Sequence, residues 1–362
     1  MNIVLLANAA SIHTIQWVMY MTKAGVKVSV ISQDEKDKEF PDDVPVYVTP
    51  YKGALGYFLN VFFVRKILKD IKPDLVHAHY ASGYGTLARL VDYHPYILSV
   101  WGSDVYDFPY KSKLHYWLVQ KNLYAADKLS STSHCMMAQT LKVAPKLSPF
   151  DVVSFGVDIH KFVAVEKSNK NEIVIGTVKT LSDKYGIDLL IKSFSILKKK
   201  LSISHAEIAS KLRLRIVGGG ELEPILKRLS CKLNIDDVTT FVGKVSHVQV
   251  PSELNKLDIY VALSRLDSES FGVAIIEAGA VKLPTVVSNV GGLPEVVQDQ
   301  KTGFVVPKEN PEAAAEILEF LALNEQERLK IGENAQIFVN ENFTWESCVE
   351  KMLIVYRELL EF

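Results

Sequence analysis

The sequence contains few cysteines and no excess of charge of either sign. Its 362 residues include three cysteines, which are scattered: Cys135, Cys231 and Cys348. Their odd number and wide spacing argue against a disulfide framework or a zinc site and suit a reducing cytosol. The 41 basic side chains are balanced by 42 acidic ones, which gives a formal net charge of −1. Because a basic surface is the usual mark of nucleic-acid binding, we expect no nucleic-acid partner.

Long hydrophobic runs are also absent. The closest approach to one, Leu55–Val64, is short and is flanked by Lys52, Arg65 and Lys66. A membrane-spanning helix needs about 20 apolar residues, so this stretch is too short to cross a bilayer. The N-terminus, M-N-I-V-L-L-A-N-A-A, lacks the basic start of a signal peptide, and we interpret it as a first strand. We therefore expect a cytoplasmic protein.

Short apolar, β-rich segments alternate in two series with helical patterns, for example Ile12–Lys23 and Tyr57–Lys69. The first series of expected strands is Ile3–Leu6, Lys27–Ile31, Leu75–His77, Tyr96–Val100, Lys128–Thr132 and Val152–Ser154. The second series is Glu172–Val178, Leu212–Val217, Val238–Phe241, Ile259–Leu263, Thr285–Ser288 and Gly303–Val306. Such alternation predicts α/β architecture, with parallel sheets covered by helices on both faces.

Two series in one chain predict two doubly wound, Rossmann-like domains, which also suits a length beyond one hydrophobic core. The segment after Phe155 becomes polar and loses periodicity, as expected of a linker. We predict a first domain at 1–158, a second at 159–343, and a final helix at 344–362 that packs back onto the first. Because ligands of open α/β sheets bind beyond the carboxyl ends of strands, we expect the two domains to face a shared cleft.

Two glutamates, Glu269 and Glu277, stand with seven residues between them in an otherwise apolar segment. A buried carboxylate is costly unless it is paired, so a polar group should meet Glu277. If a helix begins near Phe271, the free N–H groups at Phe271, Gly272 and Val273 could bind an anionic oxygen. Glu277 could then accept from paired hydroxyls, such as a ribose diol. The simpler alternative pairs the acids with nearby lysines.

Two other segments of the second half contain candidate ligand-binding residues. Lys179 and Lys184 lie in the loop after an expected strand, where two ammoniums suit a diphosphate, although lysines are also common on exposed loops. The run V-G-G-G-E contains Gly218 and Gly219 between a strand and a helix. Glycines there permit a ligand to approach the backbone closely, and they are equally typical of tight connections.

Candidate residues in the first half follow expected strands. His13 lies in a first helical turn, Trp101 and Asp104 lie in a W-G-S-D loop, and His77 and His79 stand two apart at a strand end. Asp104 could accept from a sugar hydroxyl or serve as a turn aspartate. No third ligand lies near the two histidines in sequence, so we expect no metal site.

Basic and aromatic residues cluster in two stretches of the first half. One stretch spans Tyr51–Lys66, and the other spans Tyr110–Trp117. Such mixtures suit an anionic lipid surface, which would make the protein a peripheral component of the inner membrane surface. An aromatic stripe is more often part of a core, and the sequence leaves both interpretations open.

Together these motifs resemble the retaining glycosyltransferases of family 4, which have the two-domain GT-B fold. The most specific matches are E-S-F-G-V-A-I-I-E (Glu269–Glu277), K-T-L-S-D-K-Y-G (Lys179–Gly186), V-G-G-G-E (Val217–Glu221) and F-G-V-D-I-H-K-F (Phe155–Phe162). The resemblance is strong from about residue 173 to 307 and fair elsewhere.

The resemblance implies a role for each matching residue. Glu277 would bind the ribose of a nucleotide, and Glu269 would contact the donor sugar beside Phe271–Val273. Lys179 and Lys184 match a basic pair that neutralises the diphosphate. The resemblance implies no cofactor and no metal, in agreement with the lack of an Asp-x-Asp element in the sequence. These residues would serve a donor site in the second domain.

The first domain would bind the acceptor. The resemblance counts Asp104 among the catalytic residues, together with Glu269, Lys184 and Lys179. His13, His79 and Trp101 would lie on the acceptor side. Trp101 stands where relatives often have histidine, and Lys179 stands where they more often have arginine, which binds a diphosphate bidentately. The acceptor side is therefore expected to differ from that of relatives.

These observations predict a retaining hexosyltransferase that uses a nucleotide-diphosphate sugar. Its acceptor would be a saccharide or a lipid-linked saccharide, in cell-envelope polysaccharide or lipopolysaccharide biosynthesis by analogy. Two alternatives remain at this point: a sugar-nucleotide epimerase on the same fold, and a non-catalytic two-lobed protein that binds small molecules.

Overall fold

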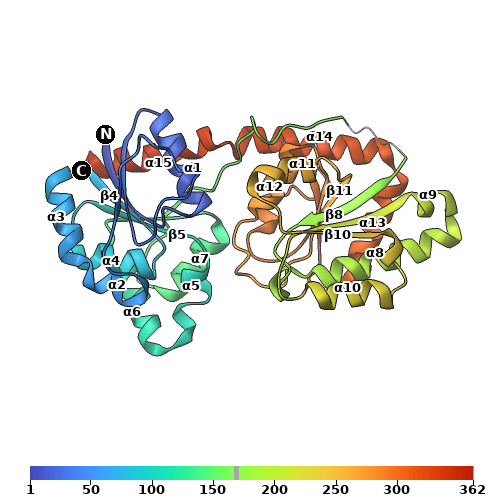
Figure 1. Ribbon diagram of the computed structural model, residues 1–362, viewed down its shortest axis with the longest axis horizontal. Coiled ribbons are helices and arrows are strands. Elements are labelled where there is room, and N and C mark those ends of the chain that lie inside the picture. The colour runs from blue at the N-terminus through green and yellow to red at the C-terminus, as the bar shows by residue number, and fades with distance from the viewer. Residues whose placement is uncertain (167–170, 362) are drawn as a thin grey trace. The chain divides into compact units, whose positions relative to one another are not determined.

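The computed structural model describes residues 1–166 and 171–361. The chain forms two compact units, which can be followed by colour in Figure 1. The first unit comprises Met1–Gly156 and Trp345–Phe362, and the second comprises Val157–Thr344. The sequence predicted residues 159 and 343 as the bounds of the second domain. Because Trp345–Phe362 belongs to the first unit, the last helix of the chain returns to that unit.

The first unit contains, among the described residues, a parallel sheet in the order β3-β2-β1-β4-β5-β6-β7. Its strands are β1 (Asn2–Leu6), β2 (Lys27–Ser32), β3 (Val46–Val48), β4 (Leu75–His79), β5 (Tyr96–Val100), β6 (Lys128–Ser131) and β7 (Asp151–Val152). Its helices are α1 (Ile12–Lys23), α2 (Gly53–Leu59), α3 (Val61–Ile71), α4 (Gly83–Val91), α5 (Ser103–Tyr106), η1 (Pro109–Lys111), α6 (Lys113–Ala125), α7 (His134–Val143) and α15 (Trp345–Leu360).

The second unit contains a parallel sheet in the order β10-β9-β8-β11-β12-β13. Its strands are β8 (Ile173–Val178), β9 (Leu212–Val217), β10 (Thr239–Gly243), β11 (Ile259–Ala262), β12 (Thr285–Ser288) and β13 (Gly303–Val306). Its helices are η2 (Asp183–Tyr185), α8 (Ile187–Ser204), α9 (Ala206–Lys211), α10 (Glu223–Lys232), η3 (Asp236–Val238), η4 (His247–Gln249), α11 (Val250–Leu254), α12 (Val273–Ala280), η5 (Leu293–Glu295), α13 (Pro311–Leu323) and α14 (Glu325–Asn342).

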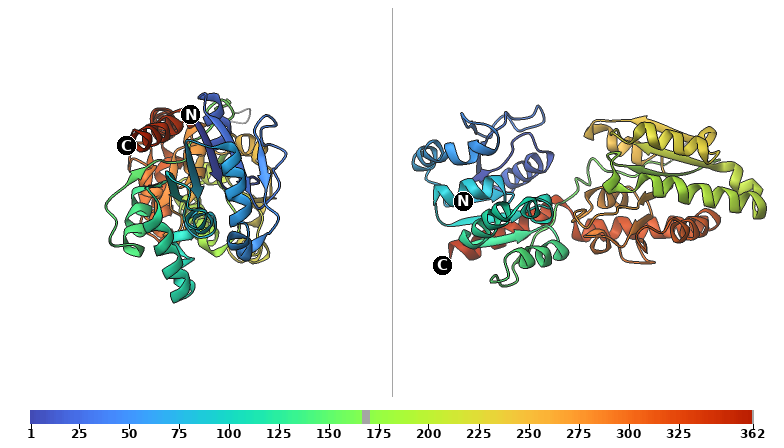
Figure 2. Two further views of the ribbon diagram at one scale, coloured as in Figure 1. Left: turned by 90° about the vertical axis from the view of Figure 1, so that its left-hand side faces the viewer. Right: turned by 90° about the horizontal axis from the view of Figure 1, so that it is seen from below.

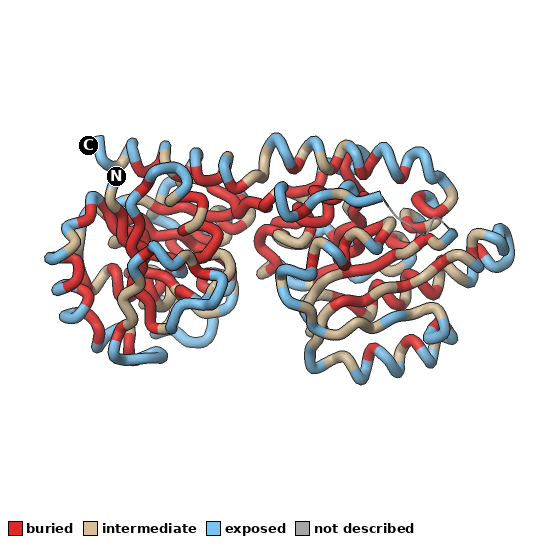
Figure 3. Tube along the Cα trace, turned by 45° about the horizontal axis from the view of Figure 1, so that its top comes forward, coloured by how far each residue is buried: buried red, intermediate tan, exposed pale blue. Residues whose placement is uncertain are grey.

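Each unit has its own apolar core between sheet and helices. Ile3–Leu6 are completely buried in the first unit, because a parallel strand covered on both faces needs a continuous apolar run. Figure 3 shows this pattern as buried strands surrounded by helices with exposed outer faces, and Figure 2 shows the helices on both sides of each sheet. The prediction of two doubly wound parallel sheets is confirmed.

Two local details differ from the sequence-based expectation. The edge strand Val46–Val48 was not predicted, because three half-buried residues give too short an alternation. The expected helix around Tyr57–Lys69 is two helices that meet at Asn60. The buried amide of Asn60 donates to the carbonyl of Tyr51 (2.7 Å) and to Oγ1 of Thr49 (3.0 Å), and this local pairing accompanies the break.

Helix α15 is held to the first unit by aromatic packing and by buried hydrogen bonds. Trp345 lies edge-on to Trp17 of α1, with ring centroids 5.3 Å apart. The buried hydroxyl of Tyr356 pairs with Nδ1 of His77 on β4 at 2.6 Å, and Nε2 of His77 pairs with Oγ of Ser99 at 2.6 Å. The final helix therefore completes the polar network inside the first unit.

Replacing Tyr356 with phenylalanine tests this contribution. The Tyr356→Phe variant leaves a buried ring nitrogen of His77 without its partner, which should lower the free energy of unfolding by about 1–3 kcal/mol. Chemical denaturation of the full chain, monitored by a signal from the first unit, measures this change in the free energy of unfolding. Ile354→Ala on the same helix is the control: its side chain is 46% exposed, and it should change stability by about 0.5 kcal/mol or less. Equal effects of the two variants would contradict the proposed network.

Candidate functional site

A pocket in the second unit lies at the carboxyl ends of β8 and β9. Its volume is about 410 Å³. It is lined by Val178, Lys179, Thr180, Val217, Gly218, Gly219, Lys244, Val245, Val250 and Glu277. It thus brings together four residues that the sequence singled out from three separate segments: Lys179, Gly218, Gly219 and Glu277. The position agrees with the rule that ligands of open α/β sheets bind beyond the carboxyl ends of the strands.

Glu277 is the acidic residue of this pocket. It lies on α12 and is buried, with a residue exposure of 9%. Its Oε1 contacts Nε2 of His247, on the short helix η4, at 3.0 Å. The expectation that a polar group meets this carboxylate is thus fulfilled by His247, a residue that the sequence analysis did not single out. Because Glu277 also lines the pocket, its carboxylate can accept hydrogen bonds from the hydroxyl groups of a ligand.

Beside the pocket, Glu269 joins two lysines. Nζ of Lys179 lies 2.6 Å from Oε1 of Glu269, and Nζ of Lys184 lies 3.6 Å from Oε2. Lys184 also donates to the carbonyl of Ser268 at 2.8 Å. Lys179 and Glu269 are both largely buried. Two ammoniums therefore share one carboxylate, which leaves a net positive charge at this point.

The pKa values in this cluster are set by burial and by pairing. Burial by itself would raise the pKa of Glu269, but the charges and hydrogen bonds of Lys179 and Lys184 outweigh it and bring the pKa below the ordinary value. Burial would lower the pKa of Lys179, and the neighbouring Glu269 carboxylate raises it above the ordinary value instead. Glu269 and Lys179 are therefore both charged at neutral pH.

Backbone geometry explains why glycines stand at two positions of the site. Gly218 has φ of 139°, and a Cβ atom there would lie 1.9 Å from the carbonyl oxygen of Lys179. Gly272, which precedes α12, has φ of 95°, and a Cβ atom would meet Leu293 at 2.7 Å. Both positions combine a left-handed backbone with a close neighbour, so only glycine fits. Because residue 218 is glycine, the loop after β9 can lie directly against the main chain of Lys179.

The start of α12 is more closely packed than the sequence suggested. Phe271 is buried, and its ring centroid lies 5.8 Å from that of Phe343. Val273, the first residue of α12, is half-buried. None of Phe271, Gly272 and Val273 is among the residues that line the pocket. Their assignment to donor binding stays a prediction.

In the first unit, Asp104 is fully engaged by backbone groups. The carboxylate accepts from the N–H groups of Ala81 (2.7 Å), Gly102 (2.8 Å) and Trp101 (3.2 Å). Burial raises the pKa of Asp104, and these N–H groups offset only part of that effect. The structure thus places Asp104 between the loops after β4 and β5, where it holds them together. A catalytic role for it stays a prediction.

His13, His79 and Trp101 come together at the carboxyl ends of the first unit's strands. The rings of His79 and Trp101 lie 4.2 Å apart, and His13 stacks on Phe155 at 4.3 Å. His79 is buried, and neither of its ring nitrogens has a hydrogen-bond partner among the described residues. Burial, and then the neighbouring His77 and His13, hold its pKa well below the ordinary value. His79 is therefore neutral at physiological pH.

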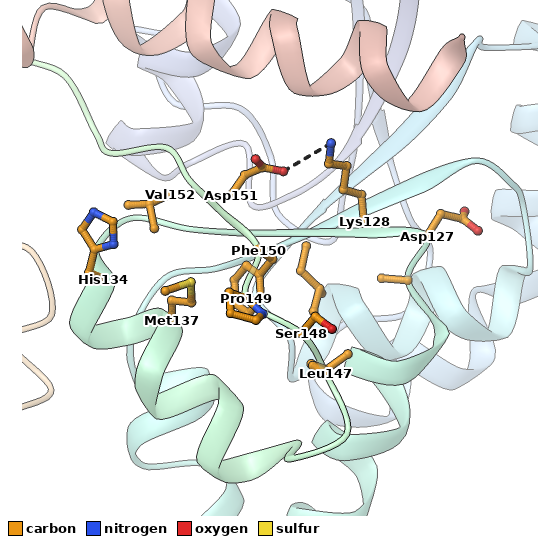
Figure 4. A pocket seen from close by; sticks show the side chains of 12 residues that line it. Asp127, Lys128, His134, Met137, Leu147, Ser148, Pro149, Phe150, Asp151 and Val152 are labelled. Carbon is orange, nitrogen blue, oxygen red and sulfur yellow. Dashed lines mark ion pairs between the residues drawn. The ribbon is translucent and has the colours of Figure 1, made fainter. Parts of the chain in front are cut away.

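A larger hollow, of about 760 Å³, lies at the edge of the first unit's sheet beside β6 and β7. Figure 4 shows it between His134 and Met137 on one side and Lys128 and Asp151 on the other. Nζ of Lys128 is paired with Asp151 at 3.4 Å and also with Glu358. None of the residues singled out by sequence lines this hollow. We therefore assign the site to the smaller pocket, where the candidate residues meet.

Two family models match the sequence. The model described as glycosyl transferases group 1 matches residues 158–338, half of the chain, and the model described as glycosyl transferase 4-like matches residues 2–133. The chain belongs to the group 1 glycosyltransferases. The predicted enzyme class is thereby confirmed, and each unit of this glycosyltransferase is matched over part of its length by a family model.

Several known proteins are similar to this glycosyltransferase. An uncharacterised glycosyltransferase of Methanocaldococcus jannaschii is 25% identical over 341 residues, covering 92% of this chain and 90% of that protein. The capsular polysaccharide biosynthesis glycosyltransferase CapM of Staphylococcus aureus is 25% identical over 366 aligned positions, covering 94% and 92%. Anabaena HepE, solved in complex with UDP-glucose, matches with a TM-score of 0.79 at 17% identity, covering 99% and 100%. This last likeness confirms the GT-B fold.

The described residues of this glycosyltransferase lack two features. No cluster of three or more histidine, cysteine, aspartate or glutamate side chains within 1–166 and 171–361 has the arrangement of a metal site. In the same part of the chain, no helix is both long enough and apolar enough to cross a bilayer.

The buried pair of Lys179 and Glu269 should stabilise the second unit. Lys179→Met leaves the largely buried Glu269 carboxylate with only the more distant Lys184, and it should lower the free energy of unfolding by about 3–5 kcal/mol. Lys184→Met, which removes the more exposed and more distant partner, should cost about 1 kcal/mol or less. Urea denaturation of the full chain, monitored by a signal from the second unit, measures the loss of unfolding free energy in both variants. A smaller loss for Lys179→Met than for Lys184→Met would contradict this order.

The same pair predicts a pH dependence. Because folding lowers the pKa of Glu269, its contribution to the free energy of unfolding is complete above the ordinary value of 4.5 and is lost as the pH falls through the lowered value. Glu269→Gln should therefore remove part of the acid sensitivity. Denaturation curves of wild type and variant between pH 7 and pH 3 check this, and parallel pH profiles would show that the carboxylate is not responsible.

Proposed function

We propose that the enzyme transfers a hexose from a nucleotide-diphosphate sugar to a saccharide or lipid-linked saccharide, with retention of the anomeric configuration. The observation that carries the proposal is the pocket in which Glu277 and Lys179 lie together. One residue is suited to hydroxyl groups and the other to phosphate. A nucleotide diphosphate presents both kinds of group, joined within one molecule.

The pocket suits a nucleoside in size and chemistry. Its volume of about 410 Å³ lies in the range of small-molecule sites. Glu277 can accept hydrogen bonds from the two hydroxyls of a ribose. Val245 and Val250 line the same pocket and can contact a planar base. His247 already contacts Glu277 at 3.0 Å, so a bound ribose would share this carboxylate with it or displace it.

The lysine pair is suited to the diphosphate. Lys179 and Lys184 together have one more positive charge than Glu269 neutralises, so the cluster attracts an anion. Negative charge grows on the leaving diphosphate in the transition state, and fixed ammoniums stabilise it. Glu269 is held between the two lysines and can still accept from a hydroxyl of the donor sugar. A carboxylate paired in this way is a poor nucleophile, and we assign it a binding role.

The named relatives support this choice of donor and acceptor. HepE was solved with UDP-glucose, a nucleotide-diphosphate sugar, and CapM is named for capsular polysaccharide biosynthesis. We therefore propose an acceptor from envelope polysaccharide synthesis, bound by the first unit, at the inner surface of the cytoplasmic membrane. Neither an epimerase nor a non-catalytic binding protein is among the similar proteins described above.

A transfer assay tests the proposal. The protein is incubated with a panel of nucleotide-diphosphate sugars and lipid-linked or free saccharides, and release of nucleoside diphosphate is measured. We expect release to depend on both substrates, to continue in EDTA, and to give a product whose anomeric proton has the donor's configuration by NMR. Inversion of configuration would contradict retention, and loss of activity in EDTA would contradict metal independence.

Glu277→Ala tests the nucleotide assignment separately. Removing the carboxylate should weaken binding of the matching nucleoside diphosphate about tenfold or more, because two charge-assisted hydrogen bonds are lost. Isothermal titration calorimetry measures the affinity. Glu316→Ala, an exposed acid on α13, is the control and should bind as wild type does. Unchanged affinity of Glu277→Ala would remove the residue from the ribose site.

A further inference from the structure

The outer face of α2 and of the start of α3 is apolar. Six large apolar side chains within Tyr51–Phe63 are exposed: Tyr51 (52%), Leu55 (72%), Phe58 (47%), Leu59 (55%), Phe62 (80%) and Phe63 (38%). The opposite face of the same helices is buried in the first unit, with Gly56, Val61 and Val64 inside. The exposed side chains are therefore not part of the core. An exposed apolar patch of this extent marks a site of interaction.

This face is built into the fold. The buried side chain of Asn60 joins the two helices to the preceding segment, donating to the carbonyl of Tyr51 and to Thr49, while the N–H of Tyr51 donates to Oδ1 of Asn60 at 3.2 Å. Arg65 donates to the carbonyls of Leu90 and Val91 at the end of α4. The two helices are thus fixed by polar contacts on their inner side while the apolar side chains point outward.

A second exposed group lies on η1 and α6. Leu114 (68%) and Trp117 (50%) are three residues apart on α6 and share one helical face, and Tyr110 (58%) lies on η1. Helices α3, α4 and α6 all contribute to one core cluster on the same face of the sheet, and α4 packs against α2 and against α6. In Figure 1, α2, α4 and α6 accordingly lie next to one another. The two exposed groups therefore flank α4 on one side of the first unit.

Both groups lie in stretches of sequence whose charged residues are basic. Residues 49–69 include Lys52, Arg65, Lys66 and Lys69 and no acidic residue. Residues 108–126 include Lys111, Lys113 and Lys121 and again no acidic residue. Since the whole chain has a net charge of −1, the remainder is acidic in balance. Positive charge is thus concentrated in the two stretches that contain the exposed apolar side chains, with Asp70, Asp107 and Asp127 at their ends.

We propose that this side of the first unit docks on the surface of a bilayer that contains anionic lipids. Aromatic and leucine side chains can enter the interface between headgroups and acyl chains, while each nearby lysine or arginine contributes about 1 kcal/mol of attraction to an anionic surface. The structure divides the aromatic side chains of the two stretches, because Tyr57 and Tyr116 pack against the core whereas others, such as Phe62 and Trp117, are exposed. The surface adds a partner to the proposed function, and its test needs no sugar substrate, so the two can fail independently.

Vesicle sedimentation tests the docking surface. The full chain is mixed with phosphatidylcholine vesicles that contain or lack phosphatidylglycerol. We expect binding to the anionic vesicles, weaker binding at high salt, and at least a tenfold loss of partitioning for the triple variant Leu55→Ser, Phe58→Ser, Phe62→Ser. The matched control replaces three exposed apolar residues of the second unit, Ile203→Ser, Leu329→Ser and Ile337→Ser, and should bind as wild type does.

Tryptophan fluorescence gives a second, local measurement. Trp117 is 50% exposed, whereas Trp17, Trp101 and Trp345 are buried. Anionic vesicles should therefore shift the emission to shorter wavelength in the wild type and not in Trp117→Phe.

Three results would overturn the proposal. These are equal binding to vesicles with and without phosphatidylglycerol, wild-type binding by the triple variant, and loss of a dimer in the triple variant without any vesicle binding by the wild type. The last result would show that the surface joins two copies of the chain.

Discussion

The buried ion pair between Lys179 and Glu269 is the interaction on which the rest of the site depends. It joins the loop after β8 to the loop before α12, so that residues 90 positions apart meet beside one pocket. Two largely buried charges are tolerated only because each neutralises the other. The left-handed backbone of Gly218 allows the close approach that holds the main chain of Lys179. The site is therefore organised before any substrate binds.

Much of the fold and part of the site could be predicted from the sequence, because their signals lie within single short segments. Parallel strands covered on both faces require continuous apolar runs, and these appear in the sequence one strand at a time. Glu269 and Glu277 were recognisable because acids are costly in such a run. His247 and Lys244 were not, although both follow a predicted strand, because nothing in their local sequence marks them as neighbours of Glu277 and the pocket. Asp104 was recognised, but its three N–H partners come from backbone that only the fold brings together.

Local sequence also could not predict the break between the two helices at 53–71. Periodicity suggested one helix, whereas the buried amide of Asn60 interrupts it with hydrogen bonds to Tyr51 and Thr49. The sequence could not decide whether the aromatic side chains belonged to a core or to a surface, because that depends on which face packs against α4. The two proposed sites lie in different units. The proposed donor site is a polar pocket in the second unit, and the proposed lipid-binding site is an exposed apolar surface on the first.

The central claim is that the pocket beside Glu277 and Lys179 holds a nucleoside diphosphate. A crystal structure of the protein with the nucleoside diphosphate released in its transfer reaction tests this most directly. The account predicts ribose hydroxyls within hydrogen-bond distance of the Glu277 carboxylate and phosphate oxygens within the same distance of Lys179 and Lys184. A nucleotide bound elsewhere, or bound with Glu277 still occupied by His247 alone, would contradict it.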